Sequence, residues 1–432
     1  MVAMPLLGLL VLVQAESLRG PLFEAEAPLA LAVRHADLPS PEHTSPTAAF
    51  AAHIGPTLVA PNEFGMRSFG VVVGCAALGV LVWLGARLFS VRTGVIAGVI
   101  LISTPMGRSF LGSQFGVQPF YLLLLLGALS ATRNLAIDKR SLTRASILGG
   151  LALALIGPAA LWIPAMTLAW LRKLRGLTWR TFGLTMGTNF LVAILVSLVA
   201  ALLTGTPLTF SIHIPPILET LPYSLVAAME LIPFLPIILL GLRNSPRHWR
   251  YHGSPNFLFL WTTLAGATLL IFGSLPALWV ALAMGAGLAT SWALARAEPS
   301  YRWAAIGAGL VLGIALGSFT STNDRFDIDR WAVREAGKFV RRNLSADAAI
   351  AAPEAARARL SYYGSRPVSP LAPSSQELEG LDYVLLSRNE TIATSEPEKP
   401  AGHPPREMTL YGKRLFVIAE FGSWMLARVE RA

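Results

Sequence analysis

The sequence has 432 residues, of which 53% are hydrophobic and 14% are charged, and its mean hydropathy is +0.55. Soluble domains carry about 25% charged residues, so this composition excludes an ordinary soluble protein and indicates a polytopic membrane protein. The net charge of +10 does not indicate a nucleic-acid partner, because most of the excess Lys and Arg lies in short loops between apolar runs, where it sets membrane orientation. Cys75 is the single cysteine, which excludes an intrachain disulfide and a cysteine-based metal site.

Residues 2–15 form the first apolar run. The run is short for a membrane span, because a helix rises about 1.5 Å per residue and the hydrocarbon core is about 30 Å thick. Its end, Val13-Gln14-Ala15, has the form of a signal-peptide cleavage site, yet no Lys or Arg precedes the run. We therefore expect a retained first helix, with a cleaved signal peptide as the alternative.

A polar loop over residues 16–67 separates the first two apolar runs, and we expect any chemistry to lie there. In an extended loop, the side chains of Glu24 and Glu26 share one face. The loop concentrates carboxylates and imidazoles in a protein that is otherwise poor in both: Glu24, Glu26, Asp37, Glu42, Glu63, His35, His43 and His53.

Apolar runs of membrane-spanning character continue to residue 320 and predict about eleven spans with the first run included. The run at 147–171 is interrupted by Gly157-Pro158, which predicts two short helices of a half-hairpin rather than one long span. A Pro-rich loop over residues 206–224 carries His213 and Glu219. The other runs cover residues 68–89, 91–107, 115–131, 181–203, 225–242, 257–272, 276–295 and 301–320.

The distribution of positive charge predicts the orientation in the membrane. With the N-terminus in the cytoplasm, the cytoplasmic loops collect fifteen Lys and Arg residues and only two acids, Asp138 and Glu298. The opposite loops before residue 321 hold only four basic residues, namely Arg19, Arg34, Arg67 and Arg108. This asymmetry is the positive-inside pattern. It predicts that the polar loop, the Pro-rich loop and the C-terminal region lie together on the outer side of the membrane.

From residue 321 onward the composition becomes that of a soluble domain, with sixteen Lys and Arg against fifteen Asp and Glu. Residues 329–343 have the spacing of a helix, and residues 348–352, 382–387 and 415–419 read as short buried strands. The fold class predicted is an α-helical polytopic membrane domain over 1–320, with the outer loop 16–67, followed by a small extracytoplasmic α/β domain over 321–432.

Several strings resemble the GT-C superfamily of membrane glycosyltransferases, in particular its protein-mannosyltransferase and aminoarabinose-transferase branch. The order of the strings along nearly the whole chain carries the resemblance. They are Asn62-Glu63-Phe64-Gly65-Met66-Arg67, Leu84-Gly85-Ala86-Arg87-Leu88-Phe89, Gly149-Gly150-Leu151-Ala152-Leu153-Ala154 before Gly157-Pro158, and Tyr362-Tyr363-Gly364-Ser365-Arg366-Pro367-Val368.

The chain also departs from this family at positions that carry chemistry in relatives. The first outer loop usually opens with Asp-Glu, whereas here the pair is Ala25-Glu26, with Glu24 one residue earlier. The second acid of the family corresponds to Gln118, and the hairpin Lys corresponds to Ile156. The later phosphate-binding Ser-x-x-Lys-x-x-x-Tyr string aligns with residues 273–279, which end in Trp279 and lack the Lys.

The resemblance implies transfer of a sugar from a polyprenyl-phosphate donor to an acceptor. We expect this transfer at the outer face of a bacterial inner membrane. Glu26 is the candidate base with Glu24 as its neighbour, and Arg67, His53 and His213 are the candidate phosphate contacts. No cofactor is required by the residues themselves, and a divalent metal ion remains open. The expected partners are the donor, a lipid, glycan or protein acceptor, membrane lipids and a possible partner membrane protein.

Two other hypotheses stand beside this one. The neutral residues at Gln118 and Ile156 favour a catalytically degenerate relative that binds lipid-linked glycan or scaffolds a partner enzyme. A transporter is the third reading, but the spans contain almost no charge and no symmetric pair of Gly- or Pro-broken helices, both of which a coupled carrier requires.

Overall fold

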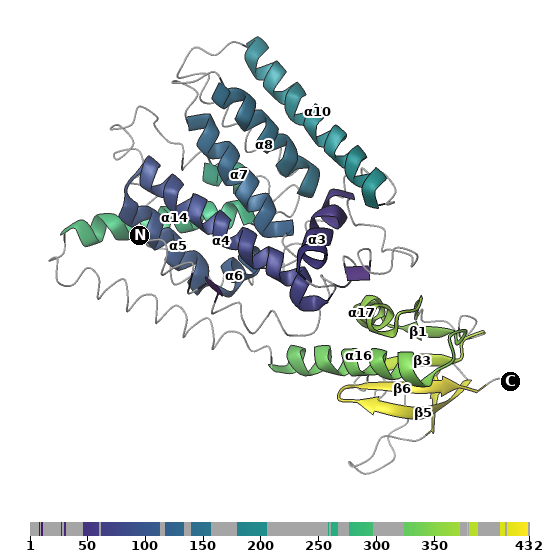
Figure 1. Ribbon diagram of the computed structural model, residues 1–432. Helices are drawn as coiled ribbons and strands as arrows, with labels where there is room; N and C mark the ends of the chain where they lie inside the picture. Colours follow the sequence, from purple (N-terminus) through teal and green to yellow (C-terminus); the bar gives the residue numbers. More distant parts are fainter. Residues whose placement is uncertain are drawn as a thin grey trace. The chain divides into compact units, whose positions relative to one another are not determined.

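The computed structural model describes residues 8, 10, 11, 27, 30, 31, 46–59, 62–112, 117–133, 140–156, 179–204, 258, 261–266, 276–296, 324–371, 378, 380–387, 407–410 and 413–430. The chain divides into two compact units. Unit 1 combines Met1–Leu18 with Ser45–Ser321, and unit 2 combines Arg19–Thr44 with Thr322–Ala432. In Figure 1, the labelled elements of unit 1 are helices, and those of unit 2 are two helices and a sheet.

Unit 1 is a bundle of apolar helices. Helix α4 packs on α5 and α7, α8 packs on α7 and α10, and α5 packs on α14. The described helices are α3 (Pro46–Leu58), α4 (Glu63–Leu88), α5 (Val91–Ser103), α6 (Pro105–Gly112), α7 (Val117–Arg133), α8 (Arg140–Ile156), α10 (Trp179–Thr204) and α14 (Pro276–Arg296).

Glycines bring the helix backbones of unit 1 close together. A Cβ atom on Gly85 of α4 would lie 2.5 Å from the Cα of Gly94 in α5, and one on Gly287 of α14 would lie 2.7 Å from the carbonyl oxygen of Thr93. Small residues at helix contacts are typical of membrane bundles, in which van der Waals packing rather than the hydrophobic effect holds helices together.

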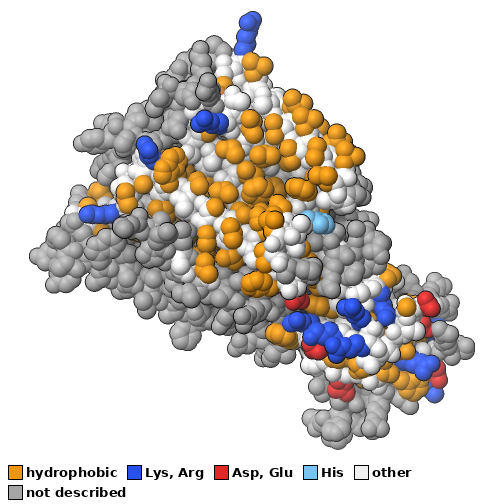
Figure 2. Space-filling model, in the orientation of Figure 1, with side chains coloured by type: hydrophobic (Ala, Val, Ile, Leu, Met, Phe, Trp, Pro, Cys, Tyr) orange, Lys and Arg blue, Asp and Glu red, His pale blue; other side chains and the backbone are white. Residues whose placement is uncertain are grey.

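The outward side of unit 1 is apolar. In α10, Leu184 is 73% exposed and Leu202 is 77% exposed, whereas Asn189 on the α8 side is buried. Figure 2 shows hydrophobic side chains spread over the described surface of this unit. Two described helical segments, Glu63–Leu88 and Arg180–Thr204, are long and apolar enough to cross a membrane, and four shorter apolar helices accompany them. The described helices therefore do not establish the predicted number of eleven spans.

Three predicted boundaries are wrong. The predicted loop 16–67 contains α3 and the first turn of α4, because an Ala-rich segment around residues 47–52 is helical despite its polar flanks. The predicted span 91–107 breaks at Thr104, whose backbone is extended, because a residue before proline is disfavoured in the helical region. Helix α8 begins at Arg140 inside the predicted basic loop, since Arg is itself a good helix former.

Unit 2 is built on a six-stranded sheet with the strand order β2-β1-β3-β6-β5-β4. Strand β1 runs parallel to β2 and β3, and the remaining pairs are antiparallel. Three of the strands lie where the sequence predicted them, namely β1, β3 and β5. The elements are α16 (Asp324–Asn343), β1 (Ile350–Ala352), α17 (Glu354–Gly364), β2 (Ser369–Pro370), β3 (Tyr383–Ser387), β4 (Glu407–Leu410), β5 (Lys413–Phe421) and β6 (Trp424–Val429).

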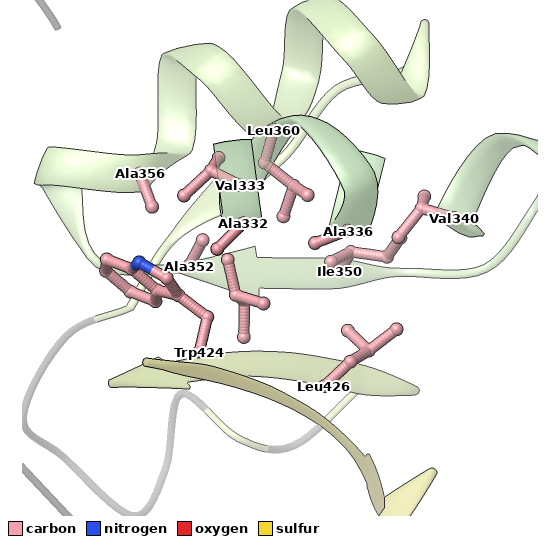
Figure 3. Packing of buried hydrophobic residues seen from close by; sticks show 11 residues of the cluster. Ala332, Val333, Ala336, Val340, Ile350, Ala352, Ala356, Leu360, Trp424 and Leu426 are labelled. Carbon is pink, nitrogen blue, oxygen red and sulfur yellow. The ribbon is translucent and has the colours of Figure 1, made fainter. Parts of the chain in front are cut away.

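Both faces of this sheet bury apolar side chains. Because neighbouring side chains of a strand point to opposite faces, Leu385 faces one cluster while Val384 and Leu386 face the other. Figure 3 shows the first cluster, in which Leu426 and Ile350 of the sheet lie beneath residues of α16 and α17. Helices α16 and α17 therefore cover one face of the sheet.

Arg366 joins the two helices of unit 2. Its guanidinium donates to the carbonyl oxygens of Ser345 at 2.6 Å, Val340 at 3.3 Å and Leu344 at 3.3 Å, which lie at the C-terminal end of α16 and just beyond it. Two of these carbonyls also accept backbone hydrogen bonds, Val340 from Leu344 and Ser345 from Ala348. The C-terminal end of a helix carries partial negative charge, so a cation is favourable there. Burial lowers the pKa of Arg366, but a guanidinium keeps its charge at physiological pH.

Candidate functional site

The N-terminal end of α4 is fixed by a cap and by close contact with α3. The Asn62 side chain accepts a hydrogen bond from the backbone nitrogen of Gly65 at 2.9 Å, as an N-cap residue does. A Cβ atom on Gly55 of α3 would lie 2.4 Å from the carbonyl oxygen of Gly65. Only glycine at position 55 therefore allows the two backbones to approach this closely.

Helix α3 is also anchored at its other end. The Thr47 hydroxyl donates to the carbonyl oxygen of Ala154 near the end of α8, and α3 packs on α10 as well. Ala48, Ala52 and Gly55 lie on its buried side. The segment between the first two apolar runs thus includes a helix that contacts α4, α7, α8 and α10.

Arg67 is buried inside this arrangement. Its exposed fraction is 2%, and it is one of the largest fully buried side chains among the described residues. It lies one helical turn after the half-buried Glu63, in the apolar helix α4. A buried guanidinium is costly unless an anionic or polar group compensates its charge.

His53 lies on α3, two residues before Gly55. Its Nδ1 donates to the backbone carbonyl oxygen of Ala49 at 2.9 Å, because a carbonyl can only accept. This bond sets the tautomer of the neutral ring and leaves Nε2 as the acceptor atom. The imidazole is half-buried. His53 and Arg67 therefore lie on the two packed helices α3 and α4, each two residues from the Gly55–Gly65 contact.

Trp279 lies at the end of the stretch 273–279, which aligns with the phosphate-binding string of the family and lacks its Lys. It is 1% exposed, and its indole Nε1 donates to Thr104 Oγ1 at 3.2 Å. Its ring meets that of Phe110 edge to face, with centroids 6.3 Å apart. The Trp279 side chain thus packs at the junction of α5 and α6, and its indole Nε1 is hydrogen-bonded there.

Gln118 occupies the position of the second family acid. It is the second residue of α7 and is half-buried. Two residues later, Phe120 meets Phe69 of α4 edge to face, with centroids 6.2 Å apart. The start of α7 therefore packs beside the first turns of α4, close in sequence to Arg67.

Of the predicted site residues, the structure describes Arg67 and His53 and brings them onto one pair of packed helices. Glu24, Glu26 and His213 lie outside the described residues. Within the described ranges, no three His, Cys, Asp or Glu side chains lie close enough to hold a metal ion. The contacts of Gly55 and Trp279 were not predicted from the sequence. The signal for Gly55 was the pair Gly55-Pro56, and the signal for Trp279 was an aromatic residue in an apolar run.

Solved structures share this fold along nearly the whole chain. The aminoarabinose transferase ArnT from Cupriavidus metallidurans bound to undecaprenyl phosphate matches with a TM-score of 0.63 and 14% identity, over 98% of this chain and 97% of that one. Its apo form matches with a TM-score of 0.64 and 13% identity, over 99% and 98%.

An archaeal protein shares the fold as well. The oligosaccharyltransferase AglB from Archaeoglobus fulgidus, in complex with an inhibitory peptide and a dolichol-phosphate, matches with a TM-score of 0.56 and 13% identity, over 91% of this chain and 70% of that one. No family model matches the sequence, and no curated protein matches it significantly. The chain has the fold of the GT-C glycosyltransferases, which confirms the resemblance found in its motifs.

Proposed function

We propose that the protein is a membrane glycosyltransferase that moves a sugar from a polyprenyl-phosphate donor to a lipid, glycan or protein acceptor at the outer face of the membrane. The observation that carries this proposal is Arg67, a buried cation near the start of an apolar helix. It lies in a chain whose fold matches that of a transferase bound to undecaprenyl phosphate. A buried guanidinium suits a phosphate that arrives on a lipid, because phosphate binds Arg through paired hydrogen bonds.

In the proposed reaction, an acceptor nucleophile attacks the anomeric carbon of the sugar while the bond to the phosphate oxygen breaks. Glu26 accepts the proton of the nucleophile, with Glu24 as its neighbour. Arg67, His53 and His213 stabilise the negative charge on the leaving polyprenyl phosphate. The tautomer of neutral His53 is already set by Ala49, so protonation at Nε2 would turn that atom into a phosphate donor.

The proposed setting is a bacterial inner membrane that the chain crosses several times, with the N-terminus in the cytoplasm. Residues 1–320 form the membrane domain, and residues 321–432 form a domain outside the cytoplasm. The apolar outward side of α10 and the positive-inside distribution of Lys and Arg support this setting.

A catalytically degenerate relative is the second candidate. It would bind lipid-linked glycan or assist a partner membrane protein without transferring sugar. Two observations favour it: the stretch 273–279, which aligns with the phosphate-binding string of relatives, lacks the Lys and buries Trp279 against Thr104 and Phe110, and the neutral Gln118 stands where relatives have an acid.

The experiment that separates the two candidates is label transfer from a polyprenyl-phosphate sugar pool in membranes that contain the protein. Wild type is compared with Glu26→Gln and Glu24→Gln at equal protein levels. The enzyme proposal expects transfer by wild type and its loss in at least one variant. Absence of transfer by wild type, or full transfer by both variants, would overturn the assigned base and favour the binding role.

A further inference from the structure

Helix α16 of unit 2 carries a basic face that the proposed reaction does not use. This basic face consists of Trp331, Arg334, Lys338, Arg341 and Arg342. The spacing of three and four residues places them on one side of the helix. Ala332, Val333, Ala336 and Val340 lie on the other side, where they pack on the sheet.

The basic face lies open at the surface. Trp331 is 47% exposed, the Lys338 side chain is 37% exposed, and Arg341 and Arg342 are exposed. Figure 2 shows Lys and Arg side chains gathered over the region of α16 and α17. The only acid of α16 after Trp331 is Glu335, whose carboxylate pairs with Lys338 at 2.7 Å. The stretch from Trp331 to the end of the helix therefore has a net charge of +3.

The aromatic ring is part of the same surface. The Arg334 guanidinium lies 4.9 Å from the centroid of the Trp331 ring and 5.9 Å from that of Tyr363 in α17. Arg341 and Arg342 in the last turn also complement the helix dipole, but that effect is confined to the last turn and does not account for Trp331, Arg334 or Lys338. An exposed Trp beside several cations is typical of surfaces at the membrane–water boundary.

Chain connectivity keeps this helix near the bilayer. The last apolar run ends at residue 320, and α16 begins at Asp324. Four residues of fully extended chain span at most about 14 Å. The start of α16 therefore cannot lie farther than about this distance from the end of the last predicted span.

We propose that the basic face of α16 docks on the phosphate groups of anionic phospholipids at the surface of the bilayer that holds unit 1. Arg334, Lys338, Arg341 and Arg342 contact lipid phosphates, and the Trp331 ring lies at headgroup level. The partner is a lipid surface rather than a soluble acidic protein, because the short connection tethers the start of the helix near the end of the last predicted span. Local lipid charge attracts such a basic segment within about a Debye length.

The test uses the full chain in lipid nanodiscs made of phosphatidylglycerol or phosphatidylcholine, each with a nitroxide on a fraction of the headgroups. Cys75→Ala removes the single cysteine, and a fluorescent label is attached at Ser345→Cys beside the basic face. A second protein carries the label at Glu420→Cys, an exposed position on β5. The charge variant is Lys338→Gln with Arg341→Gln and Arg342→Gln, and its matched control is Arg414→Gln, which is exposed on β5.

In phosphatidylglycerol, nitroxide quenching at position 345 is expected to exceed that at position 420 at least about threefold. It should fall by about half or more in phosphatidylcholine, in 1 M salt or with the charge variant, and remain with Arg414→Gln. Equal quenching at both positions, or quenching indifferent to lipid charge and salt, would overturn the proposal. The lipid and salt comparisons use the unaltered basic face, so they test docking on anionic lipid even if the charge variant misfolds.

Discussion

Arg67 combines a permanent charge with an exposed fraction of 2% in the first turns of an apolar helix. Burying a charge in such a place costs several kcal/mol unless the charge is compensated, which is the physical reason for proposing Arg67 as a phosphate contact. Among the described basic residues of unit 1, Arg92 and Arg180 are by contrast exposed.

Replacing Arg67 tests its proposed contact with the donor phosphate. Arg67→Gln should raise the donor concentration for half-maximal transfer by about 10- to 100-fold, because a hydrogen bond to a charged group contributes about 1.5–3 kcal/mol. Transfer kinetics over a range of polyprenyl-phosphate sugar concentrations measure this change. Arg92→Gln is the matched control and should leave the value unchanged. An Arg67→Gln protein with wild-type kinetics would remove Arg67 from the phosphate site.

Two substitutions of His53 separate the roles of its two ring nitrogens. His53→Asn keeps an amide nitrogen near the Nδ1 position, where it can donate to Ala49, but it removes Nε2. His53→Gln extends an amide toward the Nε2 position and gives up the bond to Ala49. If Nε2 contacts phosphate, His53→Asn should lose at least about tenfold in transfer while melting as wild type does. Equal activity of wild type and His53→Asn would show that Nε2 of His53 does not contact the phosphate.

At the scale of elements, the contact between α3 and α4 depends on Gly55. Gly55→Ala would place a Cβ atom 2.4 Å from the Gly65 carbonyl oxygen and should destabilise unit 1 by about 1–3 kcal/mol. Gly79 of α4 has no atom within 4 Å of an added Cβ, so Gly79→Ala should leave stability unchanged or raise it by up to about 1 kcal/mol. Thermal unfolding in detergent compares the two variants. A Gly55→Ala protein as stable as Gly79→Ala would show that the two helices can separate at no cost.

Arg366 gives a second prediction at this scale. Arg366→Met removes the donors to three carbonyls around the end of α16 and should destabilise unit 2 by about 1–3 kcal/mol. Hydrogen exchange in the full chain should then accelerate over residues 340–345. Arg428→Met, at an exposed position of β6, should exchange as wild type does. Unchanged exchange in Arg366→Met would contradict the capping role.

For the whole molecule, the sequence predicted what depends on long apolar patterns. The runs that became α4, α10 and α14 were predicted within a few residues, because apolar length alone defines such helices. The order of weak motifs also led to the correct fold. Strand β6 was missed because it is buried on both faces, which removes the alternation that marks a strand.

The candidate site could be predicted only in part. His53 and Arg67 were predicted from the sequence as candidate phosphate contacts. Their position on two packed helices depends on the Gly55–Gly65 contact, a close approach between helices that no local pattern encodes. The break at Thr104 followed from Pro105 and could have been predicted. The hydrogen bond from Trp279 to Thr104 at that break could not have been predicted, because it joins residues 175 positions apart in the sequence.

The central claim is that unit 1 binds a lipid through its phosphate. The measurement that tests it most directly is equilibrium binding of undecaprenyl phosphate to the purified full chain, with undecaprenol as the control. Saturable binding of the phosphate form is expected, at least about tenfold tighter than that of the alcohol. Equal binding of the two lipids, or no saturable binding of either, would contradict it.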